Sequence, residues 1–347
     1  MSRTDKSFAE NQNGAPQAHP IKDNHRMPSE FALIDLIKQR VKSRSDVVLG
    51  IGDDAALLNV PNDQYLVVST DTLNSGVHFP DDTAPEDIGY KALAVNLSDL
   101  AAMGATPAWA SLAISLPNTD IDWLEKFLDG FFELADEYGV QLIGGDTTQG
   151  PLSITITVQG FVPKGQALRR DAAKAGDEIW VTGSIGDAAG GLAQWRAKGL
   201  QSAKLRYRLD RPTPRVNVGI ALCGIANAAI DISDGLIADL SHILHASKLG
   251  AEIEVCRVPM SKPLLDHFPD DQQRYQLQLG GGDDYELCFT APAHLSMAIE
   301  QALVECDMVG TVIGHVTNGS ELKCFDENGE LFVLEKKGFE HFSRSIN

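Results

Sequence analysis

The sequence predicts an α/β protein of mixed α+β character that is divided into two domains. Its 347 residues suggest two domains, or one large one. Short apolar runs alternate with longer segments of helical periodicity in both halves of the chain. The composition changes at PKGQALRRDAAKAGDE, which begins at residue 163. We therefore expect domains at 27–163 and 164–347, after a polar and disordered extension over 1–26.

The elements of the first domain follow from apolar spacing and from capping residues. Ser29 is the predicted N-cap of a first helix, whose apolar residues recur at helical spacing. A long helix is expected from Pro85, a residue favourable at the first helical position, to Met103, with Gly104 ending it. The other expected elements are strands over 47–51 and 65–70 that lead to aspartates, a strand over 109–115, a helix from Asp120 to Gly139, a strand and turn over 140–146, and a strand over 152–162.

The second domain shows the same alternation with weaker boundaries. Residues 179–197 predict a strand, a glycine turn and a helix. A helix is expected over 215–227, and another is expected to follow DISDG at 231–235. The remaining strands are expected at 251–256, 285–290, 308–316, 322–326 and 331–335.

Composition narrows the class of function. Hydrophobic residues make up 43% of the chain and charged residues 22%, as in ordinary soluble globular proteins. The formal net charge of −19 disfavours binding to nucleic acid or to an anionic membrane. Five cysteines without a CxxC pair argue against a zinc site or a disulfide framework. The longest apolar stretch is interrupted by polar residues, so no membrane span is expected, and we expect a cytoplasmic protein.

Five acidic segments punctuate the predicted elements, and most of them follow apolar runs. They are GIGDDA at 50–55, VVSTDT at 67–72, LIGGDTT at 142–148, AIDISDG at 229–235 and LGGGDDYE at 279–286. For any one aspartate, an ordinary turn is the simpler interpretation. As a set, they match the needs of Mg²⁺, which binds one or two carboxylates together with water and substrate phosphates. Asn96 and Asp99 lie on one face of the long helix, and such a polar pair requires a partner.

Common nucleotide-binding signatures are missing from the chain. There is no GxxxxGK[ST] P-loop and no HRD–DFG pair of a protein kinase. The glycine-rich stretch TGSIGDAAGG at 182–191 lacks GxGxxG spacing, and we interpret it as a packing turn.

Six segments, taken with their order and spacing, resemble the thiamine-monophosphate kinase family over roughly residues 29–342. The segments are LGIGDDAALL, STDTLNSGVHF, YKALAVNLSDLAAMGATPAW, LIGGDTTQGPLSIT, AIDISDGL and GGGDDYELCF. NLSDLAAMGA and IGGDTT are typical of the wider aminoimidazole-ribonucleotide-synthetase-like ATP-binding superfamily. The histidine of STDTLNSGVHF and the closing KGFEHF point to this member of it. The resemblance implies the two-domain fold of that superfamily, with an N-terminal mixed sheet that pairs in a homodimer and a C-terminal α/β domain.

The resemblance also implies an activity and a set of site residues. The activity is ATP-dependent phosphorylation of thiamine monophosphate to thiamine diphosphate, assisted by several Mg²⁺ ions. Because the acceptor oxygen of a phosphate is already mostly deprotonated at neutral pH, we expect no general base. The implied Mg²⁺ ligands are Asp54, Ser69, Thr70, Asp71, Asp99, Asp146, Asp231 and Asp234. The implied nucleotide contacts are Gly145, Asp146, Arg170 and Ser233, and the implied acceptor contacts are His78, Asp283 and Phe339. Asp283 and Phe339 stand where Glu and Tyr or Trp also occur in the family. Each keeps the chemistry, a carboxylate for the thiazolium or the aminopyrimidine and a ring for stacking.

Simpler interpretations and other functions remain open at this point. His78 could be an ordinary loop histidine, Arg170 a solvated surface residue, and Phe339 an anchor of the chain end. Asp53 is interpreted as a turn residue beside the ligand Asp54. One alternative function is another ATP-dependent synthetase of the superfamily; a selenide enzyme would need a reactive cysteine early in the chain, and none precedes Cys223. The other alternative is a non-catalytic Mg²⁺- and nucleotide-binding homologue.

Overall fold

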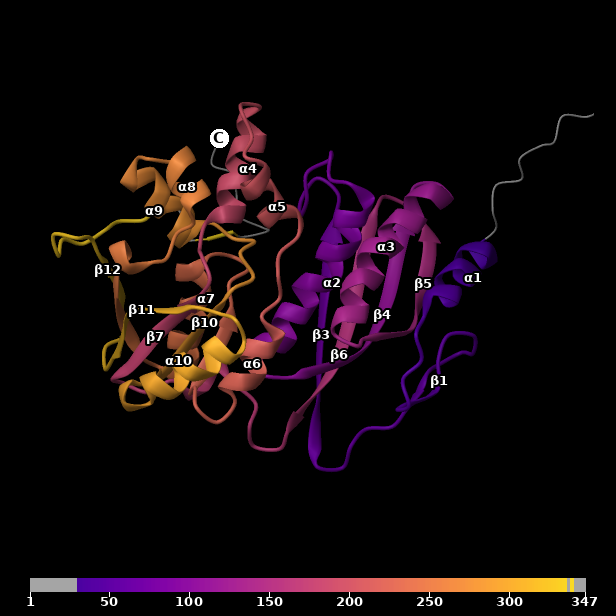
Figure 1. Ribbon diagram of the computed structural model, residues 1–347, viewed down its shortest axis with the longest axis horizontal. Helices are drawn as coiled ribbons and strands as arrows, with labels where there is room; N and C mark the ends of the chain where they lie inside the picture. Colours follow the sequence, from indigo (N-terminus) through magenta and orange to yellow (C-terminus); the bar gives the residue numbers. More distant parts are fainter. Residues whose placement is uncertain (1–29, 336–337, 340–347) are drawn as a thin grey trace, which may run out of the picture.

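A computed structural model describes residues 30–335, 338 and 339 of the chain (Figure 1). The predicted extension over 1–26 and the predicted cap Ser29 lie outside the described residues. The two halves of the chain form separate sheets, each with its own helices, and they meet along helix α2 (Figure 1). The predicted mixed α/β architecture with two modules is confirmed.

The first half is built on a four-stranded sheet of order β3-β6-β4-β5, in which only β4 and β5 run parallel. Helix α2 lies on one face of this sheet, and α3 packs against α2. The elements are α1 (Glu30–Arg40), β1 (Val47–Leu49), β2 (Leu57–Leu58), β3 (Gln64–Asn74), α2 (Pro85–Ala102), β4 (Thr106–Leu116), α3 (Ile121–Glu137), β5 (Gln141–Gln149) and β6 (Ser153–Pro163).

The second half is built on a six-stranded sheet of order β12-β9-β11-β7-β10-β8. All of its strand pairs are antiparallel except β12 with β9. The strands are β7 (Asp177–Thr182), β8 (Ala228–Asp231), β9 (Gly250–Glu254), β10 (Leu287–Pro292), β11 (Gly310–Thr317) and β12 (Leu322–Phe325). The helices are α4 (Asp187–Ala197), α5 (Ala203–Asp210), α6 (Val216–Leu222), α7 (Leu236–Ser247), α8 (Lys262–His267), α9 (Asp271–Gly280) and α10 (Ser296–Glu305), with the 3₁₀ turn η1 (Arg170–Ala172) at the start.

The predicted ends at Pro85, Gly104 and Asp120 are confirmed. Pro85 opens α2, and Gly104 follows its end with a positive φ of 68°. The side chain of Asp120 accepts a hydrogen bond from the backbone N–H of Trp123 and so caps α3. These ends are determined locally, which is why spacing and residue type were sufficient to predict them.

Several boundaries differ from the expectation, and the reason is tertiary. β3 continues past Asp71 to Asn74, and β5 continues through Gly145 to Gln149, so these acidic segments lie within strands rather than at strand ends. The pair Thr72–Thr155, with hydroxyls 2.8 Å apart, extends the β3–β6 ladder past the aspartate. The predicted strand over 331–335 is wrong: Leu331 makes only an isolated bridge with Phe325.

Helix α2 is the element that joins the two halves. It contacts β3 and β6 of the first sheet, and also α5, α6 and β8 of the second half. Nearly all of its residues from Ile88 to Ala102 are buried, including the polar residues Lys91, Asn96 and Ser98. A helix buried all round with polar residues must satisfy them against both halves, and the candidate site forms there.

Candidate active site

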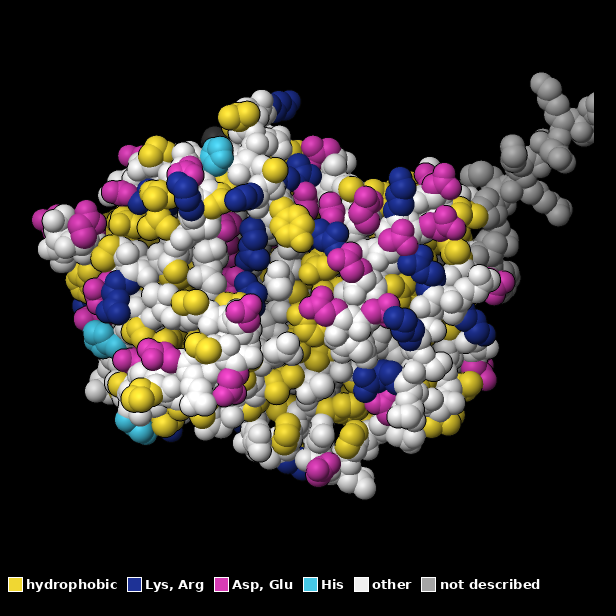
Figure 2. Space-filling model, in the orientation of Figure 1, with side chains coloured by type: hydrophobic (Ala, Val, Ile, Leu, Met, Phe, Trp, Pro, Cys, Tyr) yellow, Lys and Arg dark blue, Asp and Glu magenta, His cyan; other side chains and the backbone are white. Residues whose placement is uncertain are grey.

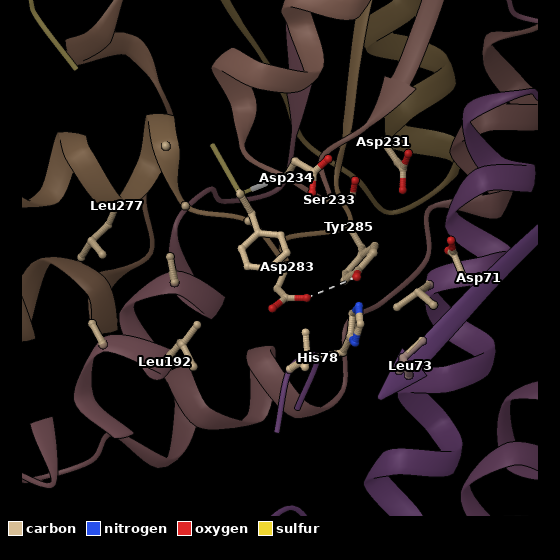
Figure 3. A pocket seen from close by; sticks show the side chains of 18 of the residues that line it. Asp71, Leu73, His78, Leu192, Asp231, Ser233, Asp234, Leu277, Asp283 and Tyr285 are labelled. Atoms are coloured by element: carbon tan, nitrogen blue, oxygen red, sulfur yellow. Dashed lines mark hydrogen bonds between the residues drawn. The ribbon is translucent and has the colours of Figure 1, made fainter. Parts of the chain in front are cut away.

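A cavity of about 730 Å³ lies between the two halves of the chain. Figure 3 shows acidic side chains from both halves around it, Asp71 from the first half and Asp231, Asp234 and Asp283 from the second. Of the residues singled out from the sequence, the cavity brings together Asp71, His78, Asp99, Asp231, Ser233, Asp234, Asp283 and Phe339.

The polar face of α2 is paired with strand β3. Ser69 donates a 2.5 Å hydrogen bond through its Oγ to Oδ2 of Asp99. Oδ1 of Asn96 accepts the backbone N–H of Asp71 at 3.0 Å, while its Nδ2 donates to the carbonyl of Ala92. The predicted need of Asn96 and Asp99 for a partner is therefore confirmed, and the contacts align Asp71 and Asp99 at one wall of the cavity.

The segment 231–235 is held in shape by a residue that the sequence analysis did not single out. Oδ2 of Asp239 accepts the backbone N–H groups of Ser233, Asp234 and Gly235 at 3.0, 3.0 and 3.1 Å. Asp239 lies in the first turn of α7, where an acidic residue is favoured. That position was the available signal, and it identifies Asp239 as the residue that shapes the loop.

The clustered carboxyl groups repel one another in a partly dehydrated space. Burial, followed by the charges of Asp99 and Asp234, raises the pKa of Asp71 to about 6. Burial raises the pKa of Asp99, against the opposing hydrogen bond from Ser69 and the charge of Arg170. Burial and the charge of Asp99 raise the pKa of Asp231 well above its usual range. A cation placed among these groups would relieve the repulsion.

The residues present fit Mg²⁺ rather than a softer metal. Every candidate ligand side chain offers oxygen, the donor that Mg²⁺ prefers. Within the described ranges, no three histidine, cysteine or acidic side chains converge closely enough to hold a metal by themselves. Sites that bind Mg²⁺ through one or two carboxylates complete the shell with water and substrate phosphates, and this arrangement agrees with that pattern.

A second cavity of about 460 Å³ lies behind Asp99 and is lined by Ser69, Arg170 and part of strand β3. Because Asp99 lines both cavities, they meet at this carboxylate. Arg169, beside Arg170, is engaged with Asp171 at 2.5 Å on the surface. The second cavity is thus lined by two arginines, of which Arg169 is paired with Asp171.

Four of the sequence-derived residues lie elsewhere. Gly145 and Asp146 line a small pocket of about 100 Å³ against α1, at the far edge of the first sheet. Asp54 is exposed, and its backbone N–H is bonded to Oδ1 of Asp53, which confirms Asp53 as a turn residue. The hydroxyl of Thr70 pairs with Thr157 on the exposed sheet face, opposite the side chains of Ser69 and Asp71. Within one chain these residues do not join the main cluster.

The loop 280–286 forms the floor of the main cavity and is anchored at both ends. Asp283 and Tyr285 have positive φ angles of 68° and 51°, which are costly for residues other than glycine. The fully buried Glu286 is paired with Arg208 at 2.8 Å and also with Arg215. Asp284 accepts the backbone N–H of Gly186 at 3.0 Å. These buried partners explain how the strained loop persists, and they give both acidic residues a structural role.

The expected acceptor contacts line the same cavity. Nδ1 of His78 accepts the backbone N–H of Asn74 at 3.0 Å, which orients the ring, and Figure 3 shows that ring facing Tyr285 and Asp283. Phe339 is 41% exposed and its backbone N–H bonds to the carbonyl of Asp234 at 3.0 Å. An exposed aromatic ring tied to the acidic loop offers a stacking surface at the cavity mouth.

Comparison with known proteins agrees with this arrangement of two halves around a shared cavity. Residues 52–162 match the family described as AIR synthase related protein, N-terminal domain, and residues 174–327 match its C-terminal domain. The chain therefore belongs to the AIR synthase related proteins.

Individual relatives narrow the family further. The chain is 51% identical to thiamine-monophosphate kinase of Escherichia coli K12, over 90% of this chain and 98% of the relative. It is 50% identical to the crystal structure of thiamine-monophosphate kinase from Stenotrophomonas maltophilia K279a, with a TM-score of 0.81 and coverage of 88% and 98%. A structure described as AaThiL complexed with AMPPCP and TMP is 32% identical, with a TM-score of 0.72 and coverage of 90% and 97%. Within the AIR synthase related proteins, the chain belongs to the thiamine-monophosphate kinase family.

Proposed function

We propose that the protein transfers the γ-phosphoryl group of ATP to the phosphate of thiamine monophosphate, giving ADP and thiamine diphosphate. The observation that carries the proposal is the meeting of two cavities at Asp99. Phosphoryl transfer requires a donor and an acceptor in line, with the negative charge neutralised between them. Two cavities joined by a carboxylate cluster meet that requirement, and the family relationship supports the same reaction.

Each cavity takes one substrate in this proposal. The nucleotide phosphates bind from the side of Arg170 and reach the backbone and hydroxyl of Ser233. The acceptor lies in the larger cavity, with its phosphate toward Asp71 and its rings toward His78, Asp283 and Phe339. The protein contributes positioning and charge, the two terms that dominate this kind of transfer.

Asp71, Asp99, Asp231 and Asp234, with the oxygen of Ser69, are proposed to hold Mg²⁺ at the junction. When bound, Mg²⁺ offsets the charges of the substrate phosphates and of the carboxylates. Asp99 and Asp71 orient toward this point through their bonds to Ser69 and Asn96. A protein with a net charge of −19 needs such a cation to bind two anionic substrates.

The transfer needs no general base. The second pKa of a phosphate monoester is near ~6, so the attacking oxygen is already deprotonated at neutral pH. We expect direct transfer without a phosphoenzyme. Incubating the protein with γ-³²P-labelled ATP alone and then denaturing it tests this: covalently retained label would contradict direct transfer.

The protein is proposed to act as a homodimer, because Gly145 and Asp146 at the far edge of the first sheet do not reach the acidic cluster of their own chain. The register of the four strands of the first sheet aligns Asp71, Ile156, Leu112 and Gly145 in one row. Three strand spacings separate Asp71 from Gly145, about 14 Å, which is too far for a shared ion. The face that carries Thr70 and Thr157 is exposed, and a second copy paired there would bring its own β5 edge toward the cluster. Asp54, Thr70, Gly145 and Asp146 keep their expected roles in that assembly.

A cytoplasmic location and freedom from nucleic acid and membranes complete the proposal. In the part of the chain that the structure describes, no helix has the length and apolarity to span a bilayer. Acidic and basic side chains are interspersed on the face shown in Figure 2, without a continuous basic surface that would attract nucleic acid.

The decisive experiment is an ADP-release assay with thiamine monophosphate, with free thiamine and with no acceptor. We expect release that depends on thiamine monophosphate and Mg²⁺. If no ADP is released with either acceptor although the nucleotide binds, the result would instead support a non-catalytic homologue. Release that depends on an unrelated acceptor would support another synthetase of the superfamily.

A further inference from the structure

A buried lysine beside the acceptor cavity bears on how the acceptor is recognised. The side chain of Lys91 on α2 is 1% exposed, and its Nζ lies 3.2 Å from Oδ1 of Asp283. The ammonium group makes no hydrogen bond with the described residues, so this ion pair is its closest compensation. Lys91 also acts at longer range on Asp210, a carboxylate already bonded to Arg206 at 2.5 Å. A lysine so deeply buried is rare unless it is paired.

The same oxygen of Asp283 is engaged a second time. Oη of Tyr285 donates to Oδ1 of Asp283 at 3.2 Å, as the dashed line in Figure 3 shows. Oδ2 has no hydrogen bond or ion pair with any described residue, and the side chain is 26% exposed. In Figure 3 the carboxylate points into the space between His78 and Leu192. One oxygen is therefore held by the protein, and the other faces the cavity.

The backbone reinforces this orientation. The N–H of Asp283 bonds to the carbonyl of Ser233 at 2.9 Å, and the N–H of Tyr285 bonds to the carbonyl of Ile232 at 2.8 Å. Asp283 adopts a φ of 68°, a conformation that aspartate tolerates better than most residues. The carboxylate is thus fixed in position, and its charge is matched by Lys91.

We infer that Lys91 converts Asp283 from a counter-ion into a directional hydrogen-bond acceptor that selects the amino group of the acceptor's pyrimidine. A carboxylate paired with an ammonium 3.2 Å away has little net field left to attract the cationic thiazolium. Its second oxygen can still accept an N–H, and discrimination by such a buried contact is large because the wrong group leaves it unpaired. Asp283 is the specificity residue, and Lys91 and Tyr285 are its positioning residues. This inference rests on the proposed function.

An analogue of thiamine monophosphate with a carbonyl oxygen in place of the 4-amino group tests the inference. It keeps the thiazolium and the phosphate. For the native protein we expect a KM for the analogue roughly 10- to 100-fold above that for thiamine monophosphate. For Asp283→Asn the KM ratio should fall to near one or reverse, because an amide can donate to the carbonyl. An equal rise of both KM values would mean that Asp283 is a counter-ion and would overturn the inference.

The positioning residues are tested with the same pair of acceptors. Lys91→Met replaces the buried charge by a neutral chain of similar length, and we expect the KM ratio to narrow severalfold while the KM for ATP stays unchanged. An unchanged ratio would remove Lys91 from this role. Should Lys91→Met fail to fold, Tyr285→Phe removes only the other bond to Oδ1 and should narrow the ratio in the same direction. Native protein that releases no acceptor-dependent ADP refutes the proposed function instead, so the two failures are distinguishable.

Discussion

Asp99 is a residue whose proposed role in the site opposes stability. Its carboxyl group is buried near other acids, a placement that raises its pKa and disfavours the ionised form. Only Ser69 and the charge of Arg170 oppose that effect. A residue chosen for stability alone would not be acidic here. The arrangement is the expected consequence of preparing a site for a cation.

Asp99→Asn is therefore expected to lower kcat/KM by at least about 100-fold while leaving the metal-free protein as stable as the native one, or more so. The amide keeps an oxygen for the bond from Ser69 but loses the charge. Steady-state kinetics and thermal unfolding in EDTA measure the two effects. Asp129→Asn, which removes an exposed carboxylate paired with Arg40, is the matched control and should retain activity. Near-native activity of Asp99→Asn at saturating Mg²⁺ would remove it from the site.

The pH dependence of stability follows from two raised pKa values. The pKa of Asp71 is about 6 and that of Asp239 about 7, in both cases mainly through burial, against a usual value of 3.8. Between pH 4 and 7 the folded protein holds protons that the unfolded chain has released. The free energy of unfolding of the metal-free protein should therefore fall as pH rises through this range, and level off above pH 7.

Each fully shifted group contributes up to about 1.4 kcal/mol per pH unit. Urea denaturation in EDTA from pH 5 to 8 measures the slope. Asp239→Asn should reduce the slope while its oxygen still accepts the backbone N–H groups of 233–235. If the free energies of unfolding of Asp239→Asn and the native protein differ by the same amount at every pH, the raised pKa of Asp239 is contradicted.

Among the elements, β3 and β5 hold candidate site residues in the middle of a strand rather than at its end. Residues that alternate along β3 point to opposite sides, so Ser69 and Asp71 face α2 while Thr70 faces outward. β5 approaches β4 closely at Gly145, which has a φ of 156°. A Cβ atom there would lie 1.8 Å from the carbonyl oxygen of Leu112. The glycine is required by the sheet itself, whatever else it binds.

Gly145→Ala and Gly144→Ala form a matched pair for this strand. Gly145→Ala should lower the free energy of unfolding by roughly 1–3 kcal/mol or more, because the backbone must shift. A Cβ atom on Gly144 would meet nothing within 4 Å, so its replacement should change stability by less than about 1 kcal/mol. Chemical denaturation compares the two. Equal stability of both variants would show that the close approach of β5 to β4 is not rigid.

For the molecule as a whole, the separation of the acidic residues into two groups is the main consequence of the topology. Asp71, Asp99 and Asp231 meet between the halves, whereas Asp146 lies at the opposite edge of the first sheet. If Asp71 and Asp146 serve one site, as proposed, that site requires a second copy of the chain, and mixing variants tests this.

Mixing Asp71→Asn and Asp146→Asn proteins after joint refolding should restore activity. If each site takes Asp71 from one copy and Asp146 from the other, a mixed dimer has one intact site and one doubly altered site. Random pairing then predicts about a quarter of native activity, measured as ADP release. If a site is completed within one chain, every site in the mixture lacks an aspartate and the mixture should be as inactive as either variant alone.

Local sequence determined the elements whose ends are local. The α2 start at Pro85, the cap at Asp120 and the turn bond at Asp53 were predictable because capping and turn bonds involve neighbours in the chain. The sequence also determined the kind of chemistry, because the acidic segments and their order carry the family relationship. Strand lengths and the helices α5, α8, α9 and α10 were missed, since weak periodicity at short elements leaves packing to decide.

Tertiary structure alone decided which acids meet and what surrounds them. Asp71, Asp99 and Asp231 are far apart in sequence. Only the burial of α2 between two sheets brings these carboxyl groups close enough to interact electrostatically. The same burial places Lys91, an ordinary helix residue by sequence, beside Asp283. Desolvation and Coulomb interaction depend on distance in space, and residue spacing along the chain does not encode that distance.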